Sequence, residues 1–497
     1  MAAGKRKSRT SNVLPKEEVS PEAVPPLPLL AASTRALAVP EILTSVLGLS
    51  KKEDLACAAL TCRKWSPVAL DHLWKELDSI APLLALVQPL RLEFEGNVAD
   101  ADWVRFRGYA CRVRSLKYDE NDRIFEKKGT FIAFSAIQTL AVVHPFGPSL
   151  LPNLDDLSWC CTTDDTILSI LPFISSSLST LKLDIEETVS EENFQRLFRS
   201  LAHRAPNLGH FKLSTPRPVT TINESLAQWF NSTPKLQTAI LPQFFHTPEI
   251  LASLGRLPQL HGLETDWSWE HTDYIQRGTS LLFPNGTYPS LRTLHFHSSL
   301  ALATKLLKTP GPVSQLKEVC FSSRKCHPFK SLEVFLSALA RGCPQLEVLF
   351  LNFATIIADH DAPDGPLTLD EFRPCLALTH LREFRVAYDY PFTLRDVDVW
   401  EMSRAWKNLR ALRLCSDPDP DAENPSENAG TPINVLKTFS VAIPNLEYLS
   451  LYFLDKEVPQ FEPDLALEGG FIGPFELDVG FSVVPGDDDH AIGYFLG

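Results

Sequence analysis

The chain has 497 residues, of which 44% are hydrophobic and 22% charged, a composition typical of a globular protein with a substantial core. Its formal net charge of −14 argues against broad binding to nucleic acids or to anionic membranes. The ten cysteines include no CxxC pair, and no apolar run has the length of a signal peptide core or a membrane span. Together these features favour a reducing compartment, the cytosol or the nucleus.

Residues 1–34 are rich in Lys, Pro, Ser and Ala and lack periodicity, which predicts a disordered basic and Pro-rich arm. Its basic cluster, Lys5-Arg6-Lys7-Ser8-Arg9, fits either a nuclear-localisation signal or a solubilising tail.

Residues 35–78 contain the start and stop signals of three short helices. Pro40 suits a first helical position, and Ser50 and Glu53 have the spacing of a capping box that opens the second helix. Ser66-Pro67 opens the third. Ile42, Leu43, Val46 and Leu47 are expected to fall on one face of the first helix. Three helices in about forty residues are too short to bury this apolar surface alone, which predicts a partner.

The order and spacing of four motifs in this region resemble the F-box, which docks onto the Skp adaptor of cullin–RING ubiquitin ligases. The motifs are Pro40-Glu41-Ile42-Leu43, Asp54-Leu55, Cys62-Arg63-Lys64-Trp65 and Leu73-Trp74. Val39 departs from the pattern, which usually opens with Leu-Pro or a similar pair. The resemblance implies binding to a Skp adaptor and, through it, to a cullin; the alternative is a helical bundle that matches by chance. The residues implied to contact Skp are Pro40, Ile42, Leu43, Leu47, Leu55, Leu60, Cys62, Trp65, Leu73 and Trp74.

Residues 79–110 carry apolar side chains at helical spacing and are expected to form a linker helix region. From residue 111 to 457 the pattern Leu-x-x-Leu-x-Leu then recurs, usually after Pro-x. Its first leucines run from Leu154 to Leu446 over ten intervals, a mean period of about 29 residues, which is the signature of a solenoid. Helical patterns lie between the repeats, and Thr431-Pro432 is expected to open one of them.

This alternation predicts an α/β fold in which the three-helix F-box precedes an irregular leucine-rich-repeat solenoid. Parallel strands would line its concave side and helices its convex side. The Asn or Cys that many such repeats place after the strand is missing, with Glu186, Ala354 and Leu454 among the replacements. An F-box followed by such repeats resembles the F-box proteins abundant in mushroom-forming fungi. Residues 458–497 lose the repeat and are expected to form a cap or tail.

No nucleotide-binding, zinc-protease or hydrolase motif is present, so we expect a non-catalytic adaptor without cofactor or metal. Two acidic inserts, 359–366 and 417–430, are expected to be solvated loops rather than calcium sites. His295 and His297 point to the same side of a predicted strand, which suits a metal or, more simply, a polar strand face.

Strand alternation brings aromatic and arginine side chains together on the concave face of the last four repeats. Phe350, Arg385 and Arg413 are expected in one row. These residue types are enriched at binding hot spots, so we expect a target protein to bind here, with the two arginines reading an acidic or phosphorylated group. The alternative is a solvated face with scattered charge. The residues expected to contact the target are Phe350, Asn352, Glu383, Arg385, Arg413, Tyr448 and Tyr452.

The resemblance therefore implies the substrate-recognition subunit of a Skp–cullin–F-box ubiquitin ligase, whose repeats bind a target protein for ubiquitination. The alternative is a leucine-rich-repeat scaffold that contacts Skp without promoting ubiquitination. A pull-down that recovers Skp but no cullin would favour the alternative.

Overall fold

The computed structural model divides the chain into two compact units, Met1–Trp74 and Lys75–Gly497. The residues that it describes are 36–37, 39–87, 99–119, 137, 142, 149–186, 188–216, 222–266, 283, 287–308, 311–323, 329–353, 367–418, 430–454, 470–480 and 482. The arm predicted for residues 1–34, the insert 359–366 and most of the insert 417–430 lie outside these residues.

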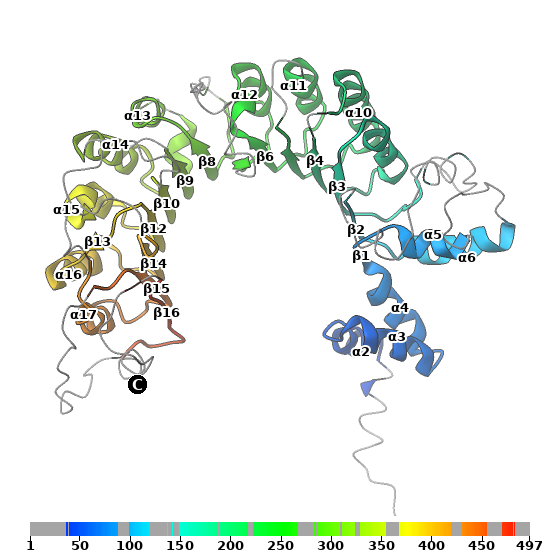
Figure 1. Ribbon diagram of the computed structural model, residues 1–497, viewed down its shortest axis with the longest axis horizontal. Coiled ribbons are helices and arrows are strands. Elements are labelled where there is room, and N and C mark those ends of the chain that lie inside the picture. The colour runs from blue at the N-terminus through cyan, green and yellow to red at the C-terminus, as the bar shows by residue number, and fades with distance from the viewer. Residues whose placement is uncertain are drawn as a thin grey trace, which may run out of the picture. The chain divides into compact units, whose positions relative to one another are not determined.

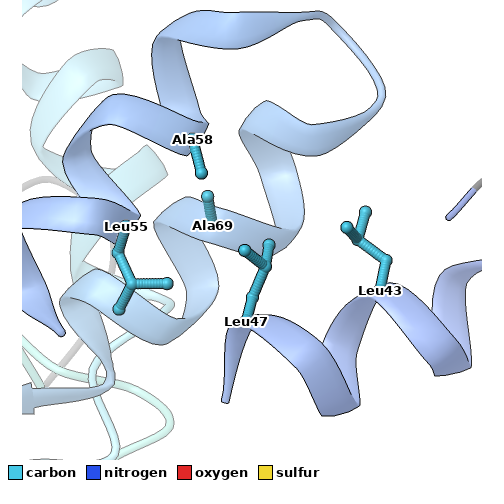
Figure 2. Close-up of a cluster of buried hydrophobic side chains, with 5 residues drawn as sticks. All are labelled: Leu43, Leu47, Leu55, Ala58 and Ala69. Carbon is cyan, nitrogen blue, oxygen red and sulfur yellow. The ribbon is translucent and has the colours of Figure 1, made fainter. Parts of the chain in front are cut away.

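The first unit is a bundle of three helices, α2 (Pro40–Leu47), α3 (Lys52–Thr61) and α4 (Trp65–Lys75). Pro40 occupies the start of α2 as predicted. The predicted capping box is wrong: Lys51 is the N-cap of α3, and the Ser50 hydroxyl instead donates to the Val46 carbonyl at 3.3 Å. The core is small, because three short helices can bury little. It consists of Leu43, Leu47, Leu55, Ala58 and Ala69 (Figure 2).

Within the described part of the chain, the second unit contains a parallel sheet of 14 strands and a small sheet of two strands. In the large sheet the strands follow one another in sequence order, and each is hydrogen-bonded to the next. The strands of the large sheet are β1 (Glu76–Leu77), β2 (Ser115–Asp119), β3 (Asp156–Cys161), β4 (Thr180–Ile185), β5 (His210–Ser214), β6 (Thr238–Pro242), β7 (Gly262–Asp266), β8 (Thr293–His297), β9 (Glu318–Ser322), β10 (Val348–Asn352), β12 (Glu383–Ala387), β14 (Ala411–Leu414), β15 (Tyr448–Leu451) and β16 (Glu476–Asp478). The small sheet pairs β11 (Leu367–Thr368) with β13 (Phe392–Thr393).

Helices connect these strands and lie along the outer side of the curved sheet (Figure 1). The α-helices are α5 (Ala81–Val87), α6 (Asp100–Ala110), α9 (Asp164–Ile167), α10 (Glu191–Arg204), α11 (Asn223–Asn231), α12 (Pro248–Leu254), α13 (Leu300–Leu307), α14 (Phe329–Gly342), α15 (Leu369–Phe372), α16 (Asp396–Ala405) and α17 (Val435–Ala442). Short 3₁₀ helices, η1 (Leu168–Phe173), η3 (Gln243–Phe245), η5 (Pro312–Gln315) and η6 (Arg373–Ala377), complete the connections. The predicted fold class is confirmed: helices at the N-terminus precede a leucine-rich-repeat solenoid.

The core of the solenoid lies between the sheet and these helices. In each repeat the last two apolar residues of the pattern point into it, as Leu349 and Leu351 of β10 do, while their strand neighbours face outward. One predicted helix opening is wrong, because α17 begins at Val435 rather than at Thr431-Pro432. The Thr431 hydroxyl is buried and joins two main-chain groups instead, donating to Phe392 at 2.9 Å and accepting from Leu394 at 3.2 Å.

At four junctions, adjacent repeats are also joined by a side chain at the position directly before the first leucine. Each of these donates to a main-chain carbonyl of the preceding repeat. The bonds are Asn153 to Cys111 at 2.7 Å, Ser177 to Leu154 at 2.7 Å, Asn207 to Ser176 at 2.7 Å and Ser290 to Pro258 at 2.8 Å.

Main-chain pairing is short between β7 and β8. These strands pair over only Gly262 with Thr293 and Leu263 with Leu294, whereas β8 pairs with β9 along its whole length. After Leu263 and Leu294, side chains rather than main-chain pairs connect β8 to the preceding strands. The Gln243 amide donates to the His297 carbonyl at 2.8 Å and accepts from its N–H at 3.1 Å, and Thr265 donates to the His295 carbonyl at 2.9 Å.

Candidate interaction surfaces

Helix α2 presents apolar side chains on two faces. Leu43 and Leu47 lie in the core, whereas the apolar stripe, defined by Val39, Ile42, Val46 and Leu49, is exposed. These four residues are spaced three, four and three apart, which aligns them along one side of a helix. Leu49 is 91% exposed, and Leu60 on α3 is 88% exposed. Exposed apolar side chains gathered in this way mark an interaction site.

The residues predicted to contact Skp divide into three groups by burial. Leu43, Leu47 and Leu55 are buried and form the bundle core, so their side chains position the surface rather than belong to it. Trp65, Leu73 and Trp74 are half-buried. Pro40, Ile42, Leu60 and Cys62 are exposed.

Ile42, Leu43, Val46 and Leu47 are not all buried: Leu43 and Leu47 lie in the core, whereas Ile42 and Val46 are 43% and 47% exposed. Successive residues of a helix point about 100° apart, so neighbours such as Ile42 and Leu43 can lie on different sides. Val39, Val46 and Leu49 were missed as candidate contacts. Their spacing relative to Ile42 was a usable signal in the sequence.

On the inner face of the solenoid, strand register brings the predicted side chains together. Phe350 pairs with Arg385, and Arg385 pairs with Arg413, so the predicted central row of these three residues is present. Glu383 and Tyr448 both align with Ala411 in the row before it. Asn352 lies at the end of β10, beside Ala387, and Tyr452 directly follows β15.

Both arginines of this surface already have an acidic partner in the chain. Arg385 forms an ion pair with Glu383. Arg413 lies 3.5 Å from Asp478 of β16, donates to the Tyr448 hydroxyl, and has its guanidinium carbon 5.2 Å from the centre of the Tyr448 ring. The sequence gives no indication of this role for Asp478, because the residue lies beyond the last repeat, where no periodic pattern predicts a strand.

His295 lies between carboxylates of the two neighbouring strands. Its Nε2 is 3.1 Å from Glu318 Oε1, and its Nδ1 is 3.7 Å from Glu264 Oε2. The hydrogen bond with His295 is the main reason that the pKa of Glu318 lies below its usual value. His297 Nδ1 lies 3.3 Å from the Ser322 hydroxyl. Both histidines thus belong to a polar strand face, and the described residues contain no group of three or more side chains arranged to hold a metal.

The cysteines of the described residues are free thiols, and several are buried. Burial, with the nearby charges of Asp119 and Asp184, raises the pKa of Cys160 to about 12, so this thiol is protonated at neutral pH and is a poor nucleophile. Among the described helices, none combines the length and apolar character needed to cross a bilayer.

Residues 40–79 match the family model described as F-box-like, and they cover the helices α2, α3 and α4. The chain therefore carries an F-box-like domain, followed by the leucine-rich-repeat solenoid defined by its strands and helices. No curated protein matches the sequence.

Solved structures similar to the chain include the leucine-rich-repeat-containing protein LegL7 from Legionella pneumophila, at 11% identity and a TM-score of 0.31, over 63% of this chain and 79% of that one. The TLR13–ssRNA13 complex is similar at 15% identity and a TM-score of 0.31, over 75% of this chain and 60% of that one. The Rad7 and Elc1 complex in yeast is similar at 17% identity and a TM-score of 0.33, over 77% of this chain and 96% of that one.

Proposed function

We propose that this protein is the substrate-recognition subunit of a Skp–cullin–F-box ubiquitin ligase. The observation that carries the proposal is the F-box-like match at residues 40–79. The exposed apolar stripe and Leu60 support it, because a lone three-helix bundle gains nothing from presenting large aliphatic side chains to water. The F-box would bind the Skp adaptor and thereby a cullin, and the repeats would bind the target. The chain itself would act as an adaptor rather than an enzyme.

The test of the first step uses side chains that the bundle core does not need. Leu55→Ala would leave a cavity in the bundle core and could unfold the domain, so it would not test binding alone. Leu60→Glu and Leu49→Glu change only exposed positions. Placing a charge against an apolar interface should cost at least about 2 kcal/mol of binding free energy, the scale of a hot-spot residue. We expect each variant to lose Skp in co-purification and in titration calorimetry.

The matched control is Val104→Glu, which adds the same charge at an exposed valine of α6 in the second unit. It should bind Skp as the unaltered chain does. Retention of full Skp binding by both leucine variants would refute docking through this surface. Recovery of Skp without a cullin would instead favour a scaffold that does not promote ubiquitination.

We further propose that the target binds the inner face of the last four repeats, through Phe350, Asn352, Glu383, Arg385, Arg413, Tyr448 and Tyr452. The shared row of Phe350, Arg385 and Arg413 supports this, because it joins one aromatic and two guanidinium groups on adjacent strands. Since both arginines are paired internally, an acidic group of the target would have to replace Glu383 or Asp478 as their partner.

The double variant Arg385→Ala with Arg413→Ala tests this site. Target proteins should be captured by affinity purification of the unaltered chain with proteasome and neddylation blocked, and identified by mass spectrometry. We expect the double variant to lose them while Skp binding and the melting temperature are kept. Lys117→Ala with Lys182→Ala, two outward-facing cations on β2 and β4, is the control of equal charge change. Capture of the same targets by the arginine variant would refute this site.

A further inference from the structure

The last strand of the sheet, β16, places a carboxylate at the edge of the proposed target surface. Strand register aligns Arg413 with Ser450 and Ser450 with Asp478, so Asp478 continues the central row of Phe350, Arg385 and Arg413 by two strands. The three residues of β16 come from beyond the repeats and lie at the open edge of β15.

The Asp478 carboxylate is held by a convergent set of donors. Its Oδ2 accepts hydrogen bonds from the Tyr448 hydroxyl and the Ser450 hydroxyl, each at 2.9 Å, and lies 3.5 Å from the Arg413 guanidinium. Its Oδ1 accepts from the Gly480 N–H at 3.1 Å. Burial opposes ionisation of Asp478, but these hydrogen bonds and the charge of Arg413 outweigh it and lower the pKa of this carboxyl. Arg413, Tyr448 and Ser450 therefore form an anion site that accepts one carboxylate.

The rest of β16 is held less firmly. Glu476 is exposed, and Leu477 is only half-buried, although the leucine that it pairs with, Leu449, is fully buried. The strand itself is held by its main-chain pairing with β15 and by Asp478. Its flanks are held by the Ile472 N–H, which donates to the Pro444 carbonyl at 2.8 Å, and by the Ser482 hydroxyl, which accepts from the Phe453 N–H at 2.7 Å. A short edge strand of this kind can be exchanged for another extended segment, because the edge offers the same N–H and C=O groups to either.

We infer that β16 occupies, from within the chain, the site that takes an extended acidic segment of the target, so that β16 and the target compete for the edge of β15 and for Arg413. This inference rests on the proposed target surface. The segment that fits has an apolar residue followed directly by an acidic or phosphorylated one, because Leu477 pairs along the core side of β15 while Asp478 meets Arg413. The chain would then bind its target only when the target outcompetes β16.

The first measurement tests whether the contacts of the Asp478 carboxylate hold β16 against β15. In the full chain, Asp478→Asn keeps the shape of the side chain and removes its charge. We expect main-chain hydrogen exchange of residues 476–480 to become at least about tenfold faster, the scale of a lost charge-assisted hydrogen bond. Glu476→Gln is the matched control, since it removes one charge from the same face of β16, where the Glu476 side chain makes no hydrogen bond or ion pair with the described residues. Its exchange should equal that of the unaltered chain.

The second measurement is whether the vacated site takes an acidic segment in trans. A labelled peptide with the sequence of residues 470–480 should bind the Asp478→Asn chain and should bind the unaltered chain more weakly. The same peptide with Asn at the position of Asp478 should bind at least about tenfold more weakly than the native peptide. Equal binding of the two peptides, or no binding of either, would overturn the inference.

The third measurement uses the target and distinguishes the proposed target surface from the competition by β16. Once a target has been identified, its affinity should rise in Asp478→Asn and stay unchanged in Glu476→Gln. If Arg413→Ala abolishes target binding but Asp478→Asn leaves it unchanged, the target surface stands and competition by β16 is refuted. If Arg385→Ala with Arg413→Ala leaves the target bound, the surface and the competition both fail. If Asp478→Asn instead speeds exchange throughout the last repeats and lowers the melting temperature, β16 is a structural cap and the inference is wrong.

Discussion

His246 is a fully buried imidazole between η3 and α12, and neither of its ring nitrogens has a hydrogen-bond partner among the described residues. Burial disfavours the charged ring and lowers its pKa to about 4. An exposed histidine in the unfolded chain has a pKa of about 6.5, so between these values the unfolded chain binds a proton that the folded chain does not. The stabilising contribution of the neutral ring is therefore complete above pH 6.5 and is lost as the pH falls toward 4.

This difference predicts a specific acid response. His246→Leu should lose less of its free energy of unfolding between pH 7 and pH 4.5 than the unaltered chain does, by about 2 to 3 kcal/mol. Urea denaturation at the two pH values measures it. His210→Leu, at an exposed histidine of β5, should keep the response of the unaltered chain. Parallel acid responses in the His246 variant and the unaltered chain would show that the buried ring is not the titrating group.

At the scale of elements, the strands were the most predictable part of the chain. Two-residue alternation fixes which side chains face outward, so the row of Phe350, Arg385 and Arg413 followed from the repeat pattern alone. The helices were less predictable in detail. Apolar residues of α2 cover two faces, and the sequence does not say which face finds a partner inside the chain and which stays exposed.

The candidate surfaces were predicted only where they depend on local pattern. Asp478 meets Arg413 through β16, a strand of three residues that carries no repeat, so its pairing depends on contacts distant in sequence. Likewise, the sequence implied ten residues for Skp contact, and folding places three of them, Leu43, Leu47 and Leu55, in the bundle core. Burial of this kind depends on how the helices pack, which a single sequence does not determine.

Thr431 was predicted to open a helix, but in the structure its side chain joins two main-chain groups, a role that can be tested. Its buried hydroxyl joins the Phe392 carbonyl to the Leu394 N–H and thereby ties the start of α17's repeat to β13. Thr431→Val keeps the shape of the side chain and removes the hydrogen bonds of its hydroxyl with both main-chain groups, so we expect a loss of about 1 to 3 kcal/mol in unfolding free energy. Thr438→Val, at a half-buried threonine of α17, is the comparison, and its loss in thermal denaturation should be smaller. Equal losses would mean that the bridge adds nothing.

At the scale of the whole solenoid, stability is a sum of repeats and of the contacts between neighbours, so the weakest contact decides where cooperativity ends. One junction with short main-chain pairing is that of β7 and β8, where Gln243 bridges to both main-chain groups of His297. Gln243→Ala should lower the unfolding free energy by about 1 to 3 kcal/mol and split urea denaturation into two transitions. Gln228→Ala, at an exposed glutamine of α11, should leave a single profile like that of the unaltered chain. A single, merely shifted transition for Gln243→Ala would argue against a junction at this point.

In four repeats the side chain that precedes the first leucine has a consequence for how the chain can vary. Asn153, Ser177, Asn207 and Ser290 each bond to a main-chain carbonyl, which every residue type offers. These four repeats therefore stay attached to their predecessors whatever side chains those predecessors carry. Substitution of the inner-face residues does not remove the partner of the attachment. Variation of the inner face is in this way separated from the requirement to keep the fold.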